Sequence, residues 1–320
     1  MNKVEPYTVT VYVALPDTRL PDSKDPNVFH GTSGMGHMYL EVAHGNHRES
    51  MGWQPTDPLP GGGYRGEPVD TDVRTYKEPY YARTLEITQE QFGKLREYGA
   101  APLRYGMDPK YDPMTNSCTD FAWGALNHAG LHARALGVEF ESFEGKSHPR
   151  DNIPHVRSIE PPFPNSPLNK EVRNPAPRQT FQQWLFTDND SVMGNQIAQG
   201  VAALDASHGR TPDEASERMC GSLFCLVKEN GLSRVDHVLL SKADAQGQSG
   251  TNVFVVQGEP SDPAHLRASI STAVAAQTPL QESMERAERI VQSQTSAQVA
   301  TQQQTQVQDQ EQQAVNQRMA

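Results

Sequence analysis

The sequence predicts an α+β protein built from two units, followed by a polar C-terminal tail. Short runs near the N-terminus alternate between apolar and polar residues, as in residues 8–13, which is typical of half-buried strands. Elsewhere apolar residues recur at helix spacing behind capping residues, as in residues 115–131. From about residue 292 the chain is dominated by Gln, Ser, Thr and Ala, a composition that does not sustain a core.

Residues 1–143 are expected to form the first unit. Alternation and turn residues predict its strands at 8–13, 37–43, 47–53 and 80–87, with loops over 16–36 and 56–68. Thr88 and Gln91 form a capping box for a helix that carries Phe92, Leu95 and Tyr98 on one side. A second helix is expected to begin near Cys118.

Residues 144–194 are predicted to be a Pro-rich linker or a loop draped over the first unit. Proline recurs so often over 144–180 that neither a helix nor a central strand is expected there. The apolar run TFQQWLF at 180–186 is expected to anchor the segment to one of the units.

Residues 195–291 are expected to form the second unit, and residues 292–320 a frayed or disordered Gln-rich tail. The runs RVDHVLLS and NVFVVQG predict two strands. Helices are predicted over 193–207, from the capping box Thr211-Pro212-Asp213-Glu214 to Asn230-Gly231, after Ser261-Asp262-Pro263 and after Thr278-Pro279.

Composition excludes several classes of protein. The net charge of −11 over 320 residues argues against a nucleic-acid partner and against attraction to an anionic lipid surface. Three cysteines do not make a disulfide framework. The N-terminal run indicates a strand and not a secretory signal, and no run is long enough to span a membrane. We therefore expect synthesis in the cytoplasm and export without a cleavable signal.

Cys118 lies at a position that favours reactivity. Ser117 and Asp120 form a capping pair, so Cys118 falls on the first turn of the predicted helix, and Gly130 lies where a left-handed C-terminal cap belongs. Backbone N–H groups and the helix dipole favour a thiolate there. Asn116, Ser117 and Asp120 are the expected substrate or oxyanion environment. A small packing residue is the alternative role for Cys118.

His37 is the predicted base, because it begins a strand directly after a Gly-rich loop that lets a substrate come close. A third group should orient the imidazole. The returning strand offers His47, Glu49 and Ser50, and only one parity of that strand can face His37. Glu49 is the first choice, since a carboxylate best stabilises imidazolium, and Ser50 is the second.

The main rival is a metal site, since four histidines lie within eighteen residues, at 30, 37, 44 and 47. No helical His spacing supports it, so neither a metal nor a cofactor is expected. Cys220 and Cys225 are expected to be buried packing thiols, and the pair Asp236-His237 to be structural.

The order of His37, the SMGWQP segment and the NSCTDFAWGAL helix resembles the circularly permuted members of the NlpC-type papain-like superfamily. The resemblance covers roughly residues 7–135 and departs from the family's Asn-Cys pair by the inserted Ser117. It implies a papain-like cysteine hydrolase, active on peptidoglycan stem peptides or, in permuted branches, on lipid esters or in acyl transfer.

Residues 195–320 resemble the C-terminal secretion domain of Xanthomonadales type IV secretion effectors, on GLSRVDHVLLS, the segment from VFVVQGEP to LQESM and the Gln-rich tail. This resemblance implies a bacteria-killing toxin that docks on the type IV coupling ATPase, has a cognate immunity protein and acts in the periplasm of a rival cell.

Together the two resemblances imply an antibacterial effector whose first unit cleaves an amide in peptidoglycan with Cys118 and His37. A lipid acyl hydrolase or acyltransferase on the same pair is the alternative. A non-enzymatic binder, with Cys118 as a packing residue, is the remaining class.

Overall fold

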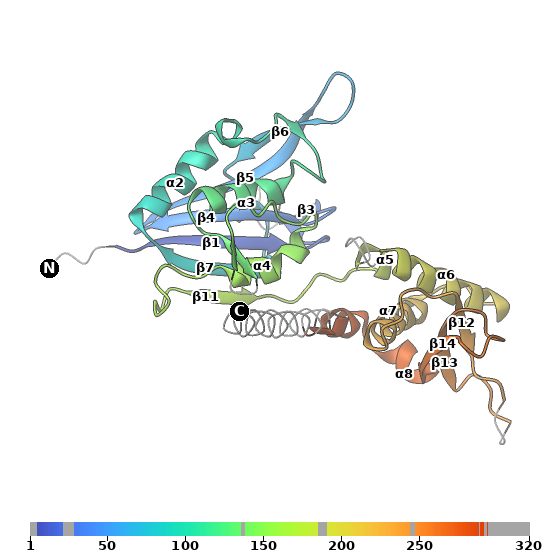
Figure 1. The fold of residues 1–320 in the computed structure, drawn as a ribbon. Helices are drawn as coiled ribbons and strands as arrows, with labels where there is room; N and C mark the ends of the chain where they lie inside the picture. The colour runs from blue at the N-terminus through green and yellow to red at the C-terminus, as the bar shows by residue number, and fades with distance from the viewer. Residues whose placement is uncertain are drawn as a thin grey trace, which may run out of the picture. The chain divides into compact units, whose positions relative to one another are not determined.

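The structure is a computed structural model that describes residues 5–21, 29–135, 138–184, 191–243, 247–287, 289–290 and 293. The chain divides into two compact units, Met1–Arg178 and Gln179–Ala320 (Figure 1). Both units contain helices and strands, so the predicted α+β class is confirmed. Apart from residue 293, the Gln-rich tail predicted from residue 292 lies outside the described residues.

The first unit is built on a seven-stranded sheet in the order β11-β7-β1-β4-β5-β6-β8 (Figure 1). Every neighbouring pair in it runs antiparallel. Its strands are β1 (Tyr7–Ala14), β4 (His37–His44), β5 (His47–Pro58), β6 (Tyr64–Val69), β7 (Tyr81–Ile87), β8 (Lys110–Tyr111) and β11 (Lys170–Arg173). The alternation that predicted β1 sorts its side chains, since Val9, Val11 and Val13 are fully buried.

Two helices, α2 (Gln89–Ala100) and α3 (Cys118–His128), pack on the face of the sheet that carries these valines. Helix α3 contacts β4 and β5, and helix α2 contacts β1 and α3. The rings of Trp53 on β5 and Phe121 on α3 stack with their centroids 6.2 Å apart. The core of the first unit therefore lies between this face and the two helices.

Both capping boxes predicted for the first unit are confirmed, Thr88 with Gln91 on α2 and Ser117 with Asp120 on α3. Cys118 is consequently the first residue of α3. Gly130 follows the other end of this helix with a φ of 72°. The N–H of Leu131 donates to the carbonyl of Leu126, which closes the helix in the way that a left-handed glycine allows.

The first unit has more strand than the sequence predicts. The segment expected to be a loop over 16–36 contains a hairpin of β2 (Arg19–Pro21) and β3 (Phe29–Thr32). The Gly/Pro segment over 56–68 is largely the hairpin of β5 and β6, whose register shifts between Pro55 and Pro58. A proline cannot donate to a strand ladder, and a local irregularity accommodates it. The remaining short elements are α1 (Asp72–Thr75), η1 (Pro102–Tyr105), β9 (Ala133–Ala135) and β10 (Val138–Phe140).

The expectation that no helix forms in 144–180 is wrong. The segment contains η2 (Pro149–Asn152), α4 (Ile153–Ser158) and the edge strand β11. Proline is tolerated at the start of a helix, where no backbone donor is needed, and Pro149 and Pro154 occupy such positions. This segment belongs to the first unit up to Arg178.

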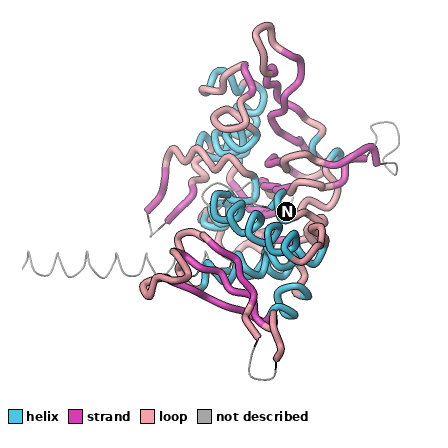
Figure 2. Tube along the Cα trace, turned by 90° about the vertical axis from the view of Figure 1, so that its right-hand side faces the viewer, coloured by secondary structure: helices cyan, strands magenta, loops and turns pink. Residues whose placement is uncertain are grey.

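The second unit packs helices against a small antiparallel sheet in the order β12-β13-β14. In Figure 2 its strands (magenta) lie beside its helices (cyan). Its elements are α5 (Phe181–Trp184), α6 (Ser191–Ser207), α7 (Glu214–Glu229), β12 (His237–Leu240), β13 (Asn252–Gln257), β14 (Leu266–Ser271) and α8 (Thr272–Gln277). Phe181 and Trp184, from the predicted anchor, are buried in the core of this unit against Phe224.

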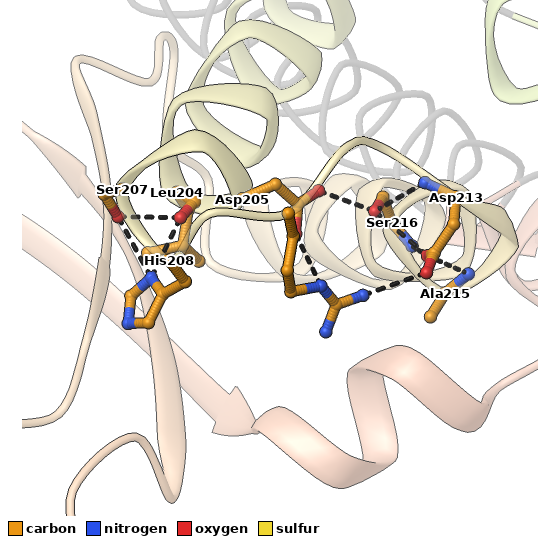
Figure 3. A network of polar contacts seen from close by, with 8 residues as sticks. Leu204, Asp205, Ser207, His208, Asp213, Ala215 and Ser216 are labelled. Atoms are coloured by element: carbon orange, nitrogen blue, oxygen red, sulfur yellow. Dashed lines mark hydrogen bonds and ion pairs between the residues drawn. The ribbon is translucent and has the colours of Figure 1, made fainter.

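The start of α7 differs in detail from the predicted box at Thr211. Asp213 is the N-cap, and it forms a capping box with Ser216 (Figure 3). The Ser216 hydroxyl also donates to Asp205, and Arg210 bridges Asp205 and Asp213. This network joins the end of α6 to the start of α7.

The helix predicted after Ser261-Asp262-Pro263 is wrong, because β14 follows instead. The carboxylate of Asp262 accepts the N–H of Ala264 two residues on, and its carbonyl accepts the N–H of His265. Asp-Pro therefore makes a turn here and does not cap a helix. A helical segment does follow Pro279, as predicted.

Candidate active site

His37 begins β4 and is almost completely buried, with 4% of its surface exposed. Gly36 makes this placement possible, since it has a φ of 81° and a Cβ there would lie 2.5 Å from the carbonyl oxygen of Ala14. Only glycine fits that turn. The Gly-rich loop before His37 thus sets where the imidazole stands.

The imidazole of His37 is held by Asp72. Nε2 of His37 lies 3.1 Å from Oδ2 of Asp72, whose side chain is fully buried at the start of α1. The other carboxylate oxygen of Asp72 accepts a hydrogen bond of 2.6 Å from the side-chain amide of Gln54. Both oxygens of this buried carboxylate are therefore satisfied.

Cys118 faces the same imidazole from the first turn of α3, with 5% of its surface exposed. The two side chains are joined by a hydrogen bond. Nε2 of His37 is committed to Asp72, which leaves Nδ1 as the nitrogen for Cys118. Burial lowers the pKa of His37, but the charge of Cys118 and the hydrogen bonds to Asp72 and Cys118 outweigh it and raise that pKa to about 10.

Tyrosines surround this group. The rings of Tyr76 and Tyr39 stack on His37 at centroid distances of 4.8 and 5.5 Å. The hydroxyl of Tyr111 accepts a hydrogen bond from the backbone N–H of Cys118. Burial raises the pKa of all three phenols, so they stay neutral at physiological pH.

The structure does not bring Glu49 to His37. Glu49 lies opposite Val42 in the β4–β5 register, whereas Ser50 lies opposite Glu41, which shares the parity of His37. The Glu49 carboxylate instead binds His47 at 2.6 Å and Arg96 at 2.7 Å. The hydrogen bond from Arg96 lowers the pKa of Glu49, with a smaller effect from His47.

Ser50 has the correct parity but touches neither Cys118 nor His37 by any contact described. Its hydroxyl accepts the backbone N–H of Val73, the residue after Asp72, at 3.2 Å. Ser50 therefore supports the element that carries the acid.

The expected oxyanion environment is occupied by structural bonds. The side chain of Asn116 binds backbone groups of Asp108 and Lys110 through its oxygen and its nitrogen. Ser117 and Asp120 are joined to each other in the capping box. These three residues shape the turn before Cys118 and the first turn of α3.

Sequence reasoning missed Asp72. It lies on a four-residue helix between two strands, and nothing in its own neighbourhood marks it. Gly52 offers a signal, because a glycine inside a strand pattern often marks close approach by another segment. A Cβ at position 52 would lie 1.8 Å from Oδ2 of Asp72.

The rival metal site gains no support from where its histidines lie. His37 binds Asp72, His44 stacks on Tyr7 at 3.9 Å, and His47 binds Glu49. Within the described ranges, no group of three or more His, Cys, Asp or Glu side chains is arranged to hold a metal ion. In the same ranges, no helix is long and apolar enough to cross a membrane.

The other predicted polar groups lie in the second unit, where the structure shows contacts within that unit for Cys225 and Asp236. Cys220 and Cys225 are buried, and burial raises their pKa values to about 12 and about 11. The thiol of Cys225 donates to the carbonyl of Ser283. Asp236 accepts the N–H of Gly258 and pairs with Arg234, which ties together the ends of β12 and β13.

Comparison with known proteins bears on the second unit alone. No curated protein matches the chain. Residues 188–289, which include α6, α7, α8 and the sheet of the second unit, match the family described as X-Tfes, XVIPCD. This family is the C-terminal domain through which Xanthomonadales effectors are recognised by their type IV secretion system. This match over residues 188–289 indicates that the chain carries the secretion domain of a type IV effector.

Proposed function

We propose that the first unit is a cysteine hydrolase in which Cys118 is the nucleophile, His37 the general base and acid, and Asp72 the group that orients His37. The observation that carries this proposal is the buried chain of contacts from Asp72 through His37 to Cys118 at a helix start. A thiol, an imidazole and a carboxylate in this order form the arrangement of nucleophilic acyl transfer.

The reaction begins when the Cys118 thiolate attacks a carbonyl carbon and the carbonyl π electrons move to oxygen. The N–H of Cys118 and the neutral hydroxyl of Tyr111, which are hydrogen-bonded to each other in the resting site, are the proposed oxyanion hole, and both would turn to the oxyanion when it forms. The imidazolium of His37 then gives its proton to the leaving amine, and the C–N bond breaks. A water molecule, deprotonated by His37, attacks the thioester and releases the acid and the thiol.

The proposed substrate is an amide of peptidoglycan in a rival bacterium. The secretion domain supports this choice, because a protein delivered to another cell by this route meets the cell wall of its target. In this proposal residues 188–289 dock on the type IV coupling ATPase, and a cognate immunity protein protects the producing cell.

A lipid acyl ester is the second candidate substrate. Met35 and Met114 are 56% and 64% exposed, and they lie two and four residues before His37 and Cys118. Exposed apolar side chains that precede the proposed catalytic pair in the sequence suit an acyl chain. The net charge of −11 opposes binding to an anionic membrane, so the amide remains the first choice.

Digestion of purified sacculi tests the proposal. The full chain should release muropeptides with a newly freed carboxyl and amine at one bond, located by mass mapping, and Cys118→Ala should release none. Release of fatty acid from phospholipid vesicles, with intact sacculi, would select the ester. If neither substrate is cleaved and iodoacetamide labels Cys118 no faster than the packing thiols Cys220 and Cys225, the hydrolase is excluded.

A further inference from the structure

Three positions on one face of β5 lie against the start of α1, the short helix that carries Asp72. Side chains alternate along a strand, so residues 50, 52 and 54 point to the same face as Glu41 and His37. Each of these three positions meets the start of α1: Ser50 binds the backbone of Val73, Gly52 lies against Oδ2 of Asp72, and Gln54 binds Oδ1.

Helix α1 has little stability of its own. It is four residues long, and its N-cap, Thr71, makes no side-chain capping bond. A helix this short does not offset the cost of nucleation. The place of Asp72 therefore depends on contacts from outside the helix, and α1 contacts β5.

We propose that Ser50, Gly52 and Gln54 form a platform, called here the acid platform, that positions Asp72 and through it fixes the imidazole of His37. Gln54 holds one carboxylate oxygen, Gly52 leaves room for the other, and Ser50 anchors the first turn of α1. None of the three touches the nucleophile in the described contacts, so they are positioning residues. Their catalytic consequence rests on the proposed hydrolase, but the positioning itself does not.

The groups that face His37 from the surrounding elements are Asp72 on α1, Cys118 on α3, Tyr39 on β4 and Tyr76 after α1. The two phenols are neutral at physiological pH, and the groups that raise the pKa of His37 are Cys118 and Asp72. Displacing Asp72 therefore has a measurable effect on the protonation of His37.

The variant Gln54→Leu distinguishes a positioning role of Gln54 from a purely electronic one, because the two roles change the pKa of His37 in opposite directions. If Asp72 kept its place, losing the amide donor would strengthen the remaining hydrogen bond to His37 and raise the pKa of His37. If Asp72 loses its place, that pKa falls. We expect a fall of at least one unit, about tenfold in the protonation equilibrium, measured by NMR titration of selectively labelled histidines in the full chain.

Three further variants complete the experiment. Asp72→Asn should give the full fall in the pKa of His37, and Ser50→Ala should give part of that fall. Thr84→Val is the matched control, because it removes the hydrogen bond between Thr84 and Thr10 in the same sheet, away from the site. It should leave the titration of His37 unchanged.

The outcomes separate the platform from the hydrolase. Gln54→Leu should be compared with the Thr84→Val control at equal melting temperature. If the pKa of His37 then rises or stays constant in Gln54→Leu, the platform is overturned. If Gln54→Leu does not fold, Ser50→Ala decides by the same criterion. A pKa that falls in both variants but does not respond to Cys118→Ala would support the platform and count against the proposed hydrolase.

Discussion

At the scale of single residues, the neighbours Cys118 and Asp72 raise the pKa of His37. Burial also acts on His155, whose pKa is lowered, with a further lowering by Lys146. The same desolvation at His37 is outweighed, because a carboxylate and a sulfur face the ring instead of an ammonium group. An imidazolium already formed in the resting site can protonate a leaving group without a prior proton uptake.

Replacing Cys118 with alanine should abolish toxicity when the protein is directed to the periplasm, while the thermal transition shifts little. Removing one sulfur from a packed site costs about 1 kcal/mol. Growth assays and calorimetry on the same variant check this. Loss of toxicity together with unfolding would identify Cys118 as a packing residue.

Asp72 and Glu49 can be compared by the same chemical change. Asp72→Asn should lower kcat strongly, since the corresponding change in a serine protease triad costs roughly 10⁴-fold. Glu49→Gln should leave kcat unaltered and change the free energy of unfolding by less than about 1 kcal/mol, because it breaks partly exposed ion pairs. Equal losses in the two variants would argue that Asp72 has no special place in the site.

Stability should depend on the titration of His37. A folded pKa of about 10 lies above the ordinary value of 6.5, so the folded state binds this proton more tightly. The resulting stabilisation is full below pH 6.5 and is lost as the pH rises towards 10. Denaturant unfolding at pH 6.5 and pH 10 should show a larger loss for the wild-type chain than for His37→Gln. Parallel losses would contradict the raised pKa.

At the scale of single elements, α3 places Cys118, the proposed nucleophile, by its own capping chemistry. Ser117 and Asp120 close the first turn, and Cys118 follows from their spacing. Ser117→Ala should lower the free energy of unfolding by about 1 kcal/mol and also reduce activity, because the first turn loses its cap.

Thr88→Ala is the control for this prediction. It breaks the corresponding capping box of α2 and should cost a similar free energy of unfolding without a loss of activity. Chemical denaturation and a hydrolysis assay on both variants provide the test. If the two variants lose equal activity, the effect is one of global stability and not of the start of α3.

Elements set by local chemistry were predictable, and those set by tertiary contacts were not. The capping boxes, Gly130 and the alternation of β1 depend on near neighbours in sequence. Which side chains of β5 share a face with His37 depends on the β4–β5 register, and a shift of one residue would present Glu49 in place of Ser50. Asp72 comes from another element, which β5 holds, so the residues around Asp72 in the sequence carry no sign of its role.

At the scale of the whole chain, the boundary between the two units lies after the edge strand of the first sheet and before the first residues of the second core. Strand β11 ends at Arg173 as an edge of the first sheet, and Phe181 and Trp184 are buried in the second core. The prolines between these elements limit regular hydrogen bonding there. A division between Arg178 and Gln179 should therefore keep both units intact.

Cutting the chain at this point should separate catalysis from delivery. Residues 1–178 should cleave the substrate at the rate of the full chain but should not reach target cells. Residues 179–320 should bind the secretion machinery and hydrolyse nothing. Hydrolysis by the first fragment beside the full chain, and secretion of the second fused to a reporter, are the two measurements. A first fragment that is folded but inactive would mean that the second unit helps to build the site.

The stability of the second fragment should depend on the residue at which it begins. A second fragment that begins at residue 195 lacks Phe181, Trp184 and the first turn of α6. Truncating a buried aromatic side chain to alanine typically costs about 3–5 kcal/mol. Fragment 195–320 should therefore melt well below fragment 179–320, or fail to fold, and should be secreted less efficiently.

The single variants Phe181→Ala and Trp184→Ala in fragment 179–320 should each reproduce part of that loss. Equal melting of the two fragments would show that α5 contributes no stability, and the boundary would then move towards residue 195.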